Sequence, residues 1–240
     1  MLELAPGRWA HASGALWLSD TRTVLLADVH LGYGWALRRR GQLGPVQEAA
    51  VRQKLFATVT ELRPHTIVFV GDVVHAPRPG REEGAAIERT LNELAGEADL
   101  VLIPGNHDRG FAKDYPAAKI RIAESWCEPG LLAVHGHVIP SATDHPSATD
   151  HLVVGHIHPA LGVVDHAGAS QKIPVFVASP RVTILPAFSP LSAGGDIRVH
   201  MPAPLEELLD ERRARIIAAS GKRVVDLGPL SRLYRQPSAW

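Results

Sequence analysis

Short runs of β-branched and aliphatic residues alternate with longer segments in which apolar residues recur every three or four positions. In segment 45–62, Val51, Leu55 and Val59 follow helical spacing, and Pro45 suits a first helical turn. Segment 81–96 has the same character and ends at a glycine. Four apolar runs predict strands: ALWL and TVLLA around the polar turn SDTR, then TIVFV and DLVLIP.

The second half of the chain is richer in strands than the first. Strands are predicted in GLLAVHG, HLVVGH, IPVFVAS, RVTILPA and DIRVH, followed by a helix over 204–221, a strand in KRVVDLG and a loosely ordered tail. This order predicts an α/β sandwich in which helices cover sheets, and no linker divides it. We therefore expect one domain over 1–240, with a core over about 14–200 and a C-terminal extension over 201–240.

Composition and charge narrow the class of protein. Lys+Arg and Asp+Glu are equal at 25 each, so the whole molecule has no net attraction for nucleic acid or anionic membranes. Cys127 is the only cysteine, which excludes an intrachain disulfide and fits a reducing compartment. The apolar runs are too short to span a bilayer, and the N-terminus does not resemble a signal peptide. We expect a cytoplasmic protein that does not enter a membrane.

Polar side chains follow five of the predicted strands directly. In chain order they are Asp28 and His30; Asp72 and His75; Asn106, His107 and Asp108; His135; and His156 and His158. Ligand crevices of open α/β sheets lie at the carboxyl ends of strands, so these residues are predicted to converge. A lone D-x-H after a strand is explained as well by chance or by a helix cap, whereas G-N-H-D after an apolar strand is more specific. All five motifs in this order indicate a site.

The residue types suit a pair of metal ions. Carboxylates, imidazoles and an amide oxygen suit divalent first-row metals, and the lack of thiolates argues against a structural zinc site. A shared carboxylate can bridge two metals at about 3.5–4 Å. Gly71, Gly105 and Gly155 are expected to let the backbone turn sharply where the strands end.

The ordered motifs D-x-H, G-D-x-x-H, G-N-H-D, a lone His and G-H-x-H resemble those of the calcineurin-like metallophosphoesterase superfamily. The resemblance covers roughly Asp28 to His158. It implies a four-layer α/β/β/α sandwich, in which two mixed β-sheets are flanked by helices and carry a dinuclear site at their strand ends.

The resemblance also implies a role for each motif residue. One metal would be held by Asp28, His30, Asp72 and His158, with Asp72 as the bridge, and the other by Asn106, His135 and His156. His107 would protonate the leaving oxygen, Asp108 would orient His107, and His75 would face the substrate phosphate.

Two divalent ions are therefore the expected cofactors, with manganese favoured and iron, zinc or nickel as alternatives. A hydroxide bridging the two metals would attack phosphorus. Arg38, Arg39 and Arg109 lie beside the motifs and are candidates to clamp phosphate, or else are solvated surface charge.

Three further segments, GALWLSDTRTVLLADVHLG, LRRRG and VFVASPRVTILPAFSPLSAGG, are similar to the DNA-ligase-associated metallophosphoesterases. That similarity implies a phosphodiester substrate such as single-stranded DNA or DNA ends, and association with a DNA ligase or helicase. Members of that subfamily usually carry Lys where this chain has Tyr33, which removes one cation near the site.

Other functions stay open. The motifs would serve a phosphodiesterase or phosphatase on a small nucleotide or metabolite equally well, and the neutral charge favours such a substrate. A non-catalytic scaffold of this fold predicts lost ligands, and none is lost here. The amphipathic segment around Leu205 leaves a homo-oligomer possible.

The remaining histidines are interpreted more simply. His145 and His151 belong to a repeated SATDH unit and are expected to be loop residues near the rim of the site, while His137 is a candidate neighbour of the ligands. The others, His11, His65, His166 and His200, read as surface or ordinary packing.

Overall fold

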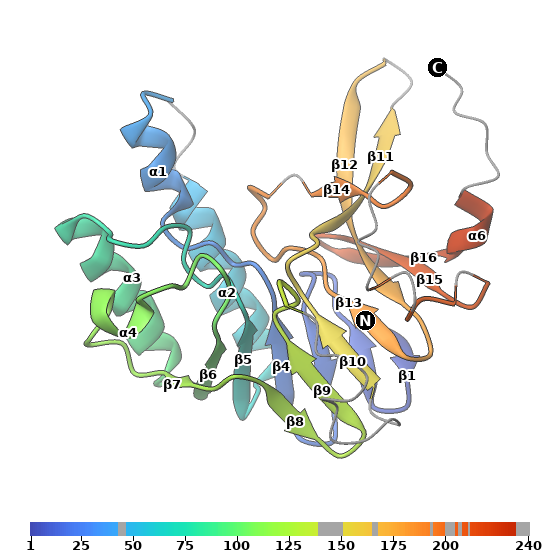
Figure 1. Ribbon diagram of the computed structural model, residues 1–240, viewed down its shortest axis with the longest axis horizontal. Coiled ribbons are helices and arrows are strands. Elements are labelled where there is room, and N and C mark those ends of the chain that lie inside the picture. The colour runs from blue at the N-terminus through green and yellow to red at the C-terminus, as the bar shows by residue number, and fades with distance from the viewer. Residues whose placement is uncertain are drawn as a thin grey trace.

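The computed structural model describes residues 1–42, 47–138, 151–164, 168–192, 194–199, 205, 208–210 and 212–233. Its first sheet has seven strands in chain order: β1 (Leu2–Ala5), β2 (Arg8–Ala10), β3 (Leu16–Leu18), β4 (Thr23–Leu26), β5 (Thr66–Val70), β6 (Asp99–Ile103) and β7 (Arg121–Ile122). Neighbours pair antiparallel from β1 to β4 and parallel from β4 to β7. The sheet is therefore mixed, and the motif-bearing strands β4, β5 and β6 all run in one direction (Figure 1).

The second sheet is built from the later strands. Its main path is β14 (Gly195–Asp196), β11 (Pro159–Val164), β12 (Ser170–Ala178), β13 (Val182–Ile184), β10 (His151–Val154), β9 (Leu131–Val134) and β8 (Trp126–Glu128). β15 (Arg215–Ser220) pairs with β12, and β16 (Arg223–Pro229) pairs with β15. β9, β10 and β13 are parallel, so the carboxyl ends of β9 and β10 lie at the same edge.

The two sheets pack face to face because their strands are apolar on both sides. Leu25 and Val68 face the second sheet and contribute to one buried cluster together with Val153 and Phe176. Their chain neighbours on β4 and β5 point the other way, toward helices. This alternation with a period of two places one core between the sheets and a second core outside the first sheet.

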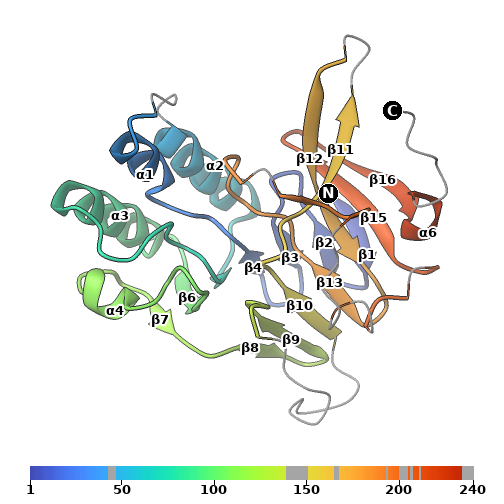
Figure 2. The ribbon, with the colours of Figure 1, turned by 45° about the horizontal axis from the view of Figure 1, so that its top comes forward.

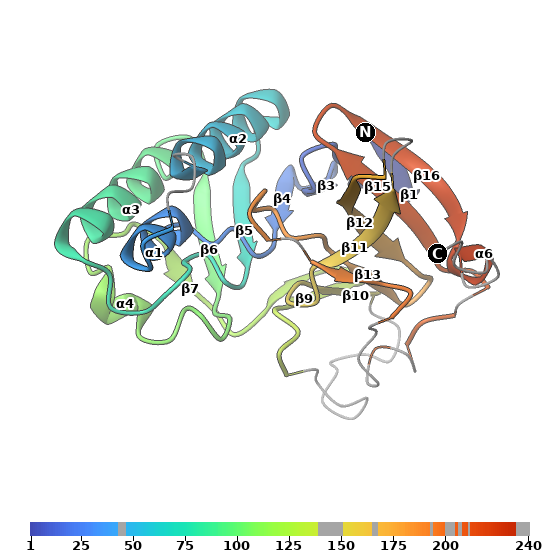
Figure 3. The same ribbon diagram turned by 90° about the horizontal axis from the view of Figure 1, so that it is seen from above.

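Helices cover the outer face of the first sheet. They are α1 (Tyr33–Arg39), α2 (Gln47–Leu62), α3 (Arg81–Leu94) and α4 (Phe111–Asp114), and Figures 2 and 3 show them on one side of the strands. The predicted helical stripe of Val51, Leu55 and Val59 is buried against this face. Among the described residues, no helix combines the length and the apolar character that crossing a membrane requires.

The predicted α/β sandwich of two mixed sheets is confirmed, but its fourth layer is thin. Leu205, Leu209 and Leu230 pack on the outer face of the second sheet, where the helix α6 (Leu230–Leu233) is one turn long. The short helix α6 lies within the part predicted as a loose tail, and the remainder of that tail lies outside the described residues.

The predicted helix over 204–221 is wrong in its second half, which forms β15. Ile216 and Ala218 face the outer layer, whereas Ile217 and Ala219 face the core between the sheets. The run RIIAAS is buried on both sides and is paired between β12 and β16, so local helical spacing yields to cross-strand hydrogen bonds.

Candidate dinuclear metal site

The motif loops converge where the strands of both sheets end. The loop after β4 runs alongside the loop after β5: the N–H of Asp28 donates to the carbonyl of Gly71 (3.1 Å), and the N–H of His30 donates to that of Asp72 (2.9 Å). On the other side, the N–H of His156 donates to Oδ2 of Asp28 (3.0 Å), although the two residues are 128 positions apart. Backbone hydrogen bonds thus join loops from both sheets into one edge.

The Asp28 group consists of Asp28, His30 and His158, with one ligand atom from each lying within 4.8 Å of the others. Oδ1 of Asp28 is 2.9 Å from Nε2 of His158, yet within the described chain neither atom has a hydrogen-bond partner. Nδ1 of His30 is also buried without a partner. Buried polar atoms are costly when unpaired, so three such atoms around one point fit a bound cation.

The Asp72 group consists of Asp72, His135 and His156, again with ligand atoms within 4.8 Å of one another. Nδ1 of His135 lies 3.0 Å from the carbonyl of Val70, which places a ring proton on Nδ1 and turns Nε2 toward the site. That Nε2 is 3.5 Å from Oδ2 of Asp72 and 3.4 Å from Oδ1 of Asn106. The predicted ligand Asn106 therefore lies with this group.

The backbone is strained at the predicted ligands. Five residues other than glycine have left-handed φ values here: Asp28 (56°), His30 (51°), Asp72 (50°), His156 (65°) and His158 (47°). Such values are uncommon for residues with a Cβ and persist where surrounding structure enforces them. The loops after β4, β5 and β10 are therefore strained at the same residues that the motifs identify as ligands.

The three motif glycines make room for ligand side chains. A Cβ on Gly71 would lie 1.9 Å from Nδ1 of His135, and one on Gly105 would lie 2.1 Å from Oδ1 of Asp72. A Cβ on Gly155 would meet Ala27 at 2.7 Å. Only Gly71 of the three has a positive φ. At Gly105 and Gly155, the close approach of neighbouring atoms is what excludes a Cβ.

Protonation states in the site also suit cations. Burial lowers the pKa of His30 to about 4, so its imidazole is neutral at pH 7. Burial alone would raise the pKa of Asp72, but hydrogen bonds from His135 and from the backbone of His107 outweigh burial and bring it to about 2. Neutral imidazoles beside an ionised carboxylate are the states that bind divalent metals, so the residues present fit two such ions.

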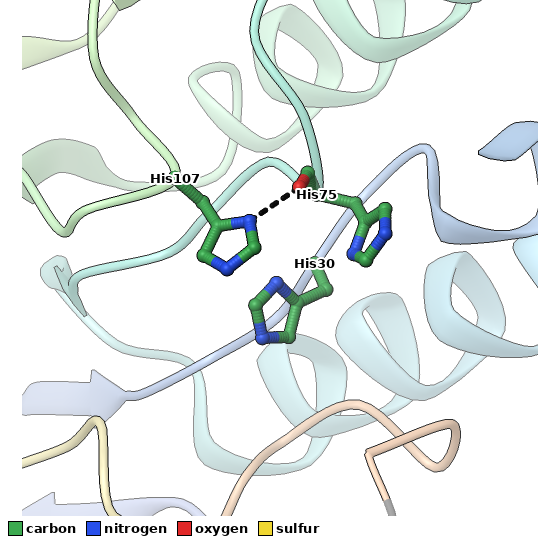
Figure 4. A group of neighbouring side chains, drawn as sticks. All are labelled: His30, His75 and His107. Atoms are coloured by element: carbon green, nitrogen blue, oxygen red, sulfur yellow. Dashed lines mark hydrogen bonds between the residues drawn. The ribbon is translucent and has the colours of Figure 1, made fainter.

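His75 and His107 lie beside the Asp28 group. Figure 4 shows them with His30, and one nitrogen from each of the three rings lies within 4.8 Å of the others. Nδ1 of His107 is 2.5 Å from the carbonyl oxygen of His75. Nδ1 of His75 is buried and, in the described structure, unpaired. The ring of Tyr33 lies 4.1 Å from that of His75 and covers this imidazole.

The predicted contact between Asp108 and His107 is not what the structure contains. Both oxygens of Asp108 accept backbone N–H groups, from Val74 (3.2 Å) and Gly105 (2.8 Å). Asp108 is buried in the turn after β6, so its carboxylate points at the backbone of its own loop and of the neighbouring one. The carbonyl of His75 orients His107 instead, a partner that no side-chain motif can reveal.

The three candidate phosphate clamps have different surroundings. The guanidinium of Arg38 lies 5.4 Å from the centroid of the Trp35 ring. Arg39 forms an ion pair with the buried carboxylate of Glu83. Arg109 is exposed. Two of the three thus already have partners within the protein.

The histidines outside the motifs lie at different distances from the site. The ring of His137 lies 5.2 Å from that of His135 and 6.3 Å from that of His156, beside the Asp72 group as expected. His151 is not a loop residue at the rim: it begins β10, at the end opposite the site, and its Nε2 is 2.8 Å from Oγ1 of Thr183. His145, His166 and His200 lie outside the described residues.

The segment after β13 contributes a support that motif reasoning missed. The N–H of Phe188 donates to the carbonyl of Ala27 (2.8 Å), and that of Ser189 donates to the carbonyl of Asp28 (3.1 Å). The LPAF run that contains Phe188 could have indicated this support, because it follows a predicted strand as the ligand motifs do.

Comparisons with known proteins agree with this geometry. The model of the calcineurin-like phosphoesterase family matches residues 21–218. Among solved structures, the nuclease MPE of Pseudomonas putida is similar, with a TM-score of 0.67 and 24% identity over 92% of this chain and 94% of that one. Curated protein sequences contain no match. The family match spans most of the chain and both ligand groups, so the chain belongs to the calcineurin-like phosphoesterase family and is a metal-dependent phosphoester hydrolase.

Proposed function

We propose that this protein is a manganese-dependent phosphodiesterase that cleaves DNA strands or DNA ends. The observation that carries the proposal is the pair of three-residue groups at one edge, with His107 beside them. The similarity in fold to a nuclease, over nearly the full length of both chains, supports a polynucleotide substrate. The segments that resemble DNA-ligase-associated enzymes support the same choice.

Each residue has a proposed task. The Asp28 group would hold one cation, and the Asp72 group with Asn106 would hold the other. By the family resemblance, Asp72 would also serve the first cation. Divalent cations bound there supply a nucleophile from water and neutralise charge on the phosphoryl oxygens. Because Nδ1 of His107 is held by the carbonyl of His75, protonated His107 directs its second N–H toward the leaving oxygen. The unpaired Nδ1 of His75 is a donor for a phosphoryl oxygen.

The test is cleavage of circular single-stranded DNA in the presence of manganese, run beside hydrolysis of bis(p-nitrophenyl) phosphate. His107→Ala should lower kcat on DNA by about 10²–10⁴-fold, because general-acid help of that size is lost. The loss on the nitrophenyl ester should be smaller, since nitrophenolate leaves without a proton. His65→Ala is the matched control, because His65 is exposed and lies before β5, at the end opposite the site.

The outcomes separate the candidate functions. A cut circle identifies cleavage within a strand, whereas activity on linear DNA alone identifies cleavage from ends. Hydrolysis of only the small ester favours a small nucleotide or metabolite as substrate, which the equal numbers of acidic and basic residues also favour. If manganese-loaded protein acts on neither substrate, the proposal is wrong and the result favours a non-catalytic scaffold.

Metal identity and cellular context are part of the proposal. Mass spectrometry of metals in purified protein should find close to two manganese ions per chain, with iron, zinc or nickel as alternative occupants. Co-purification with a DNA ligase or helicase from the native cell would support the proposed association. A single cysteine favours a cytoplasmic setting, which cell fractionation would test.

A further inference from the structure

A cavity of about 500 Å³ lies against the Asp72 group. Its lining combines apolar side chains from the first and second sheets with a few polar ones, among them Ile103, Leu132, Val134, Ser125, Cys127 and His137. The volume falls within the range of about 300–1,000 Å³ that is typical of small-molecule pockets. None of these six residues belongs to the predicted metal ligands, and the reaction described above leaves the cavity without a role.

The cavity borders the candidate metal site, because the two share His135. The ring of His137, which also lines it, lies 5.2 Å from that of His135 and 6.3 Å from that of His156. A group that occupied the cavity would therefore lie beside His135 and His137, next to a phosphoryl group held at the Asp72 group.

The lining determines the chemistry of that substituent. No Lys or Arg lines the cavity as the described residues define it, and Glu124 is its one carboxylate. A second phosphate would find no cation there and would be repelled by Glu124. An uncharged, flat group with apolar faces and hydrogen-bonding edges suits the lining better, because Ile103 and Leu132 offer apolar contact and Ser125 and His137 offer polar atoms.

We propose that this cavity binds the nucleobase of the nucleotide next to the scissile phosphate. Nucleobases bind proteins in this way, with their faces on apolar or aromatic side chains and their edges on a few polar groups. The hydroxyl of Ser125 has only a long 3.9 Å contact with the sulfur of Cys127, which leaves it available to a base edge. The inference rests on the proposed phosphodiesterase function and names the part of the substrate that the enzyme recognises.

Cys127 allows a direct test, because it is exposed, lines the cavity and is the only cysteine of the chain. N-Phenylmaleimide attached to Cys127 would place a ring at the cavity. The substrates to compare are thymidine 5′-(p-nitrophenyl phosphate) and methyl p-nitrophenyl phosphate, which share a leaving group and differ in whether the phosphate carries a nucleoside or a methyl group. Labelling should lower the ratio of kcat/KM for the thymidine ester to that for the methyl ester at least tenfold.

Two controls isolate the cavity. Cys127→Ala protein treated with the same reagent should keep the ratio of the untreated variant. The double variant Cys127→Ala/Ser170→Cys carries the label on β12 at an exposed position and should keep it as well. A ratio that is unchanged by labelling Cys127, or that falls equally with the label at position 170, would overturn the inference.

A second measurement does not depend on catalysis. Thymidine 5′-monophosphate should slow the labelling of Cys127 at least fivefold in manganese-loaded protein, as followed by mass spectrometry, whereas methyl phosphate should not. Protection without hydrolysis of either ester would mean that the cavity binds the base but that the proposed phosphodiesterase function is wrong. Equal rates with and without thymidine monophosphate, in protein that hydrolyses the methyl ester, would mean that the function stands and the cavity does not bind the base.

Discussion

The two ligand groups differ in how their buried polar atoms are paired. In the Asp28 group, Oδ1 of Asp28, Nδ1 of His30 and Nε2 of His158 have no hydrogen-bond partner among the described residues. In the Asp72 group, Oδ1 of Asp72 accepts the N–H of His107 (2.8 Å), and both ring nitrogens of His135 have polar neighbours. Each carboxylate has one oxygen that accepts a backbone N–H, which for Asp28 comes from His156, but the Asp28 group keeps three buried atoms without a hydrogen bond and therefore depends more on a cation.

The loops behind the two groups are supported differently as well. The Asp28 loop is held by the backbone of Phe188 and Ser189, and the carbonyl of Phe188 accepts a hydrogen bond from the ammonium group of Lys54 (2.6 Å). The Asp72 loop is held by the carboxylate of Asp108, which bonds two backbone N–H groups nearby. The support of the Asp28 loop thus includes Lys54 of α2, which is distant from that loop in the sequence. The support of the Asp72 loop comes from Asp108, which belongs to a motif loop itself.

The largest expected effect is that of Asp28→Asn, which keeps the side-chain volume and removes the charge. We expect kcat/KM to fall by about 10³-fold, because a cation ligand contributes several kcal/mol of transition-state stabilisation. Calorimetric titration of metal-free protein with manganese should lose the tighter of two binding steps. Asp72→Asn is the comparison variant, and loss of the tighter step there instead would reverse the contrast between the groups.

Removal of metal should come next in size. Manganese at about 100 times its Kd should stabilise the folded protein by about 2.7 kcal/mol per site, since it binds only the folded state. Thermal unfolding with and without a chelator measures this gain. His158→Ala should abolish more of the gain than His135→Ala, because both ring nitrogens of His135 have polar neighbours in the protein, whereas Nε2 of His158 is buried without a hydrogen bond in the described structure. Equal losses in the two variants would show that hydrogen bonding within the Asp72 group contributes nothing.

Gly71→Ala tests whether the position of the His135 ring matters to the Asp72 group, because it introduces a steric clash with that ring. The new Cβ would lie 1.9 Å from Nδ1 of His135, so the ring must move away from Val70 and from the metal position. Together with the strain of a φ of +78°, this should lower the free energy of unfolding by about 1–3 kcal/mol and remove one manganese ion per chain.

The matched control for that substitution is Gly221→Ala. Gly221 has a similar φ of +66° but nothing within 4 Å of the new Cβ, so it reports the strain alone. Denaturant unfolding and metal analysis of both variants separate strain from displacement of His135. If Gly221→Ala were as destabilising as Gly71→Ala and both retained two ions, the contact with His135 would not matter.

The smallest expected effect concerns the support of the Asp28 loop. Burial lowers the pKa of Lys54 from 10.5 to about 8, so the folded protein binds fewer protons than the unfolded chain between these two values. The free energy of unfolding of the protein, minus that of Lys54→Met, should therefore be lowest below pH 8. This difference should rise by about 1 kcal/mol per pH unit from pH 8 to 10. Denaturant unfolding of both proteins at pH 7, 8 and 9 measures the difference, and a constant difference would contradict it.

The sequence predicted which strands and residues form the site more fully than it predicted the hydrogen-bond partners of those residues. Each motif is short and follows a strand whose apolar run is read directly, so the loops that carry Asp28, Asp72 and His156 could be placed from local patterns alone. The partner of His107 could not, because it is a backbone carbonyl on another loop. The orientation of Asp108 was missed for the same reason, since its partners are backbone N–H groups.

By itself, the sequence determined the class of fold, the two longer helices on the first sheet and the residues that chemistry requires at the strand ends. Periodicity and strand-end motifs are local, and each is complete within a few residues. The tertiary structure decided that RIIAAS is a strand, that His151 lies far from the site, and how the ligands divide into two groups. Those outcomes depend on hydrogen bonds between segments far apart in the chain, such as that between His156 and Asp28 at a separation of 128 residues, which no local pattern contains.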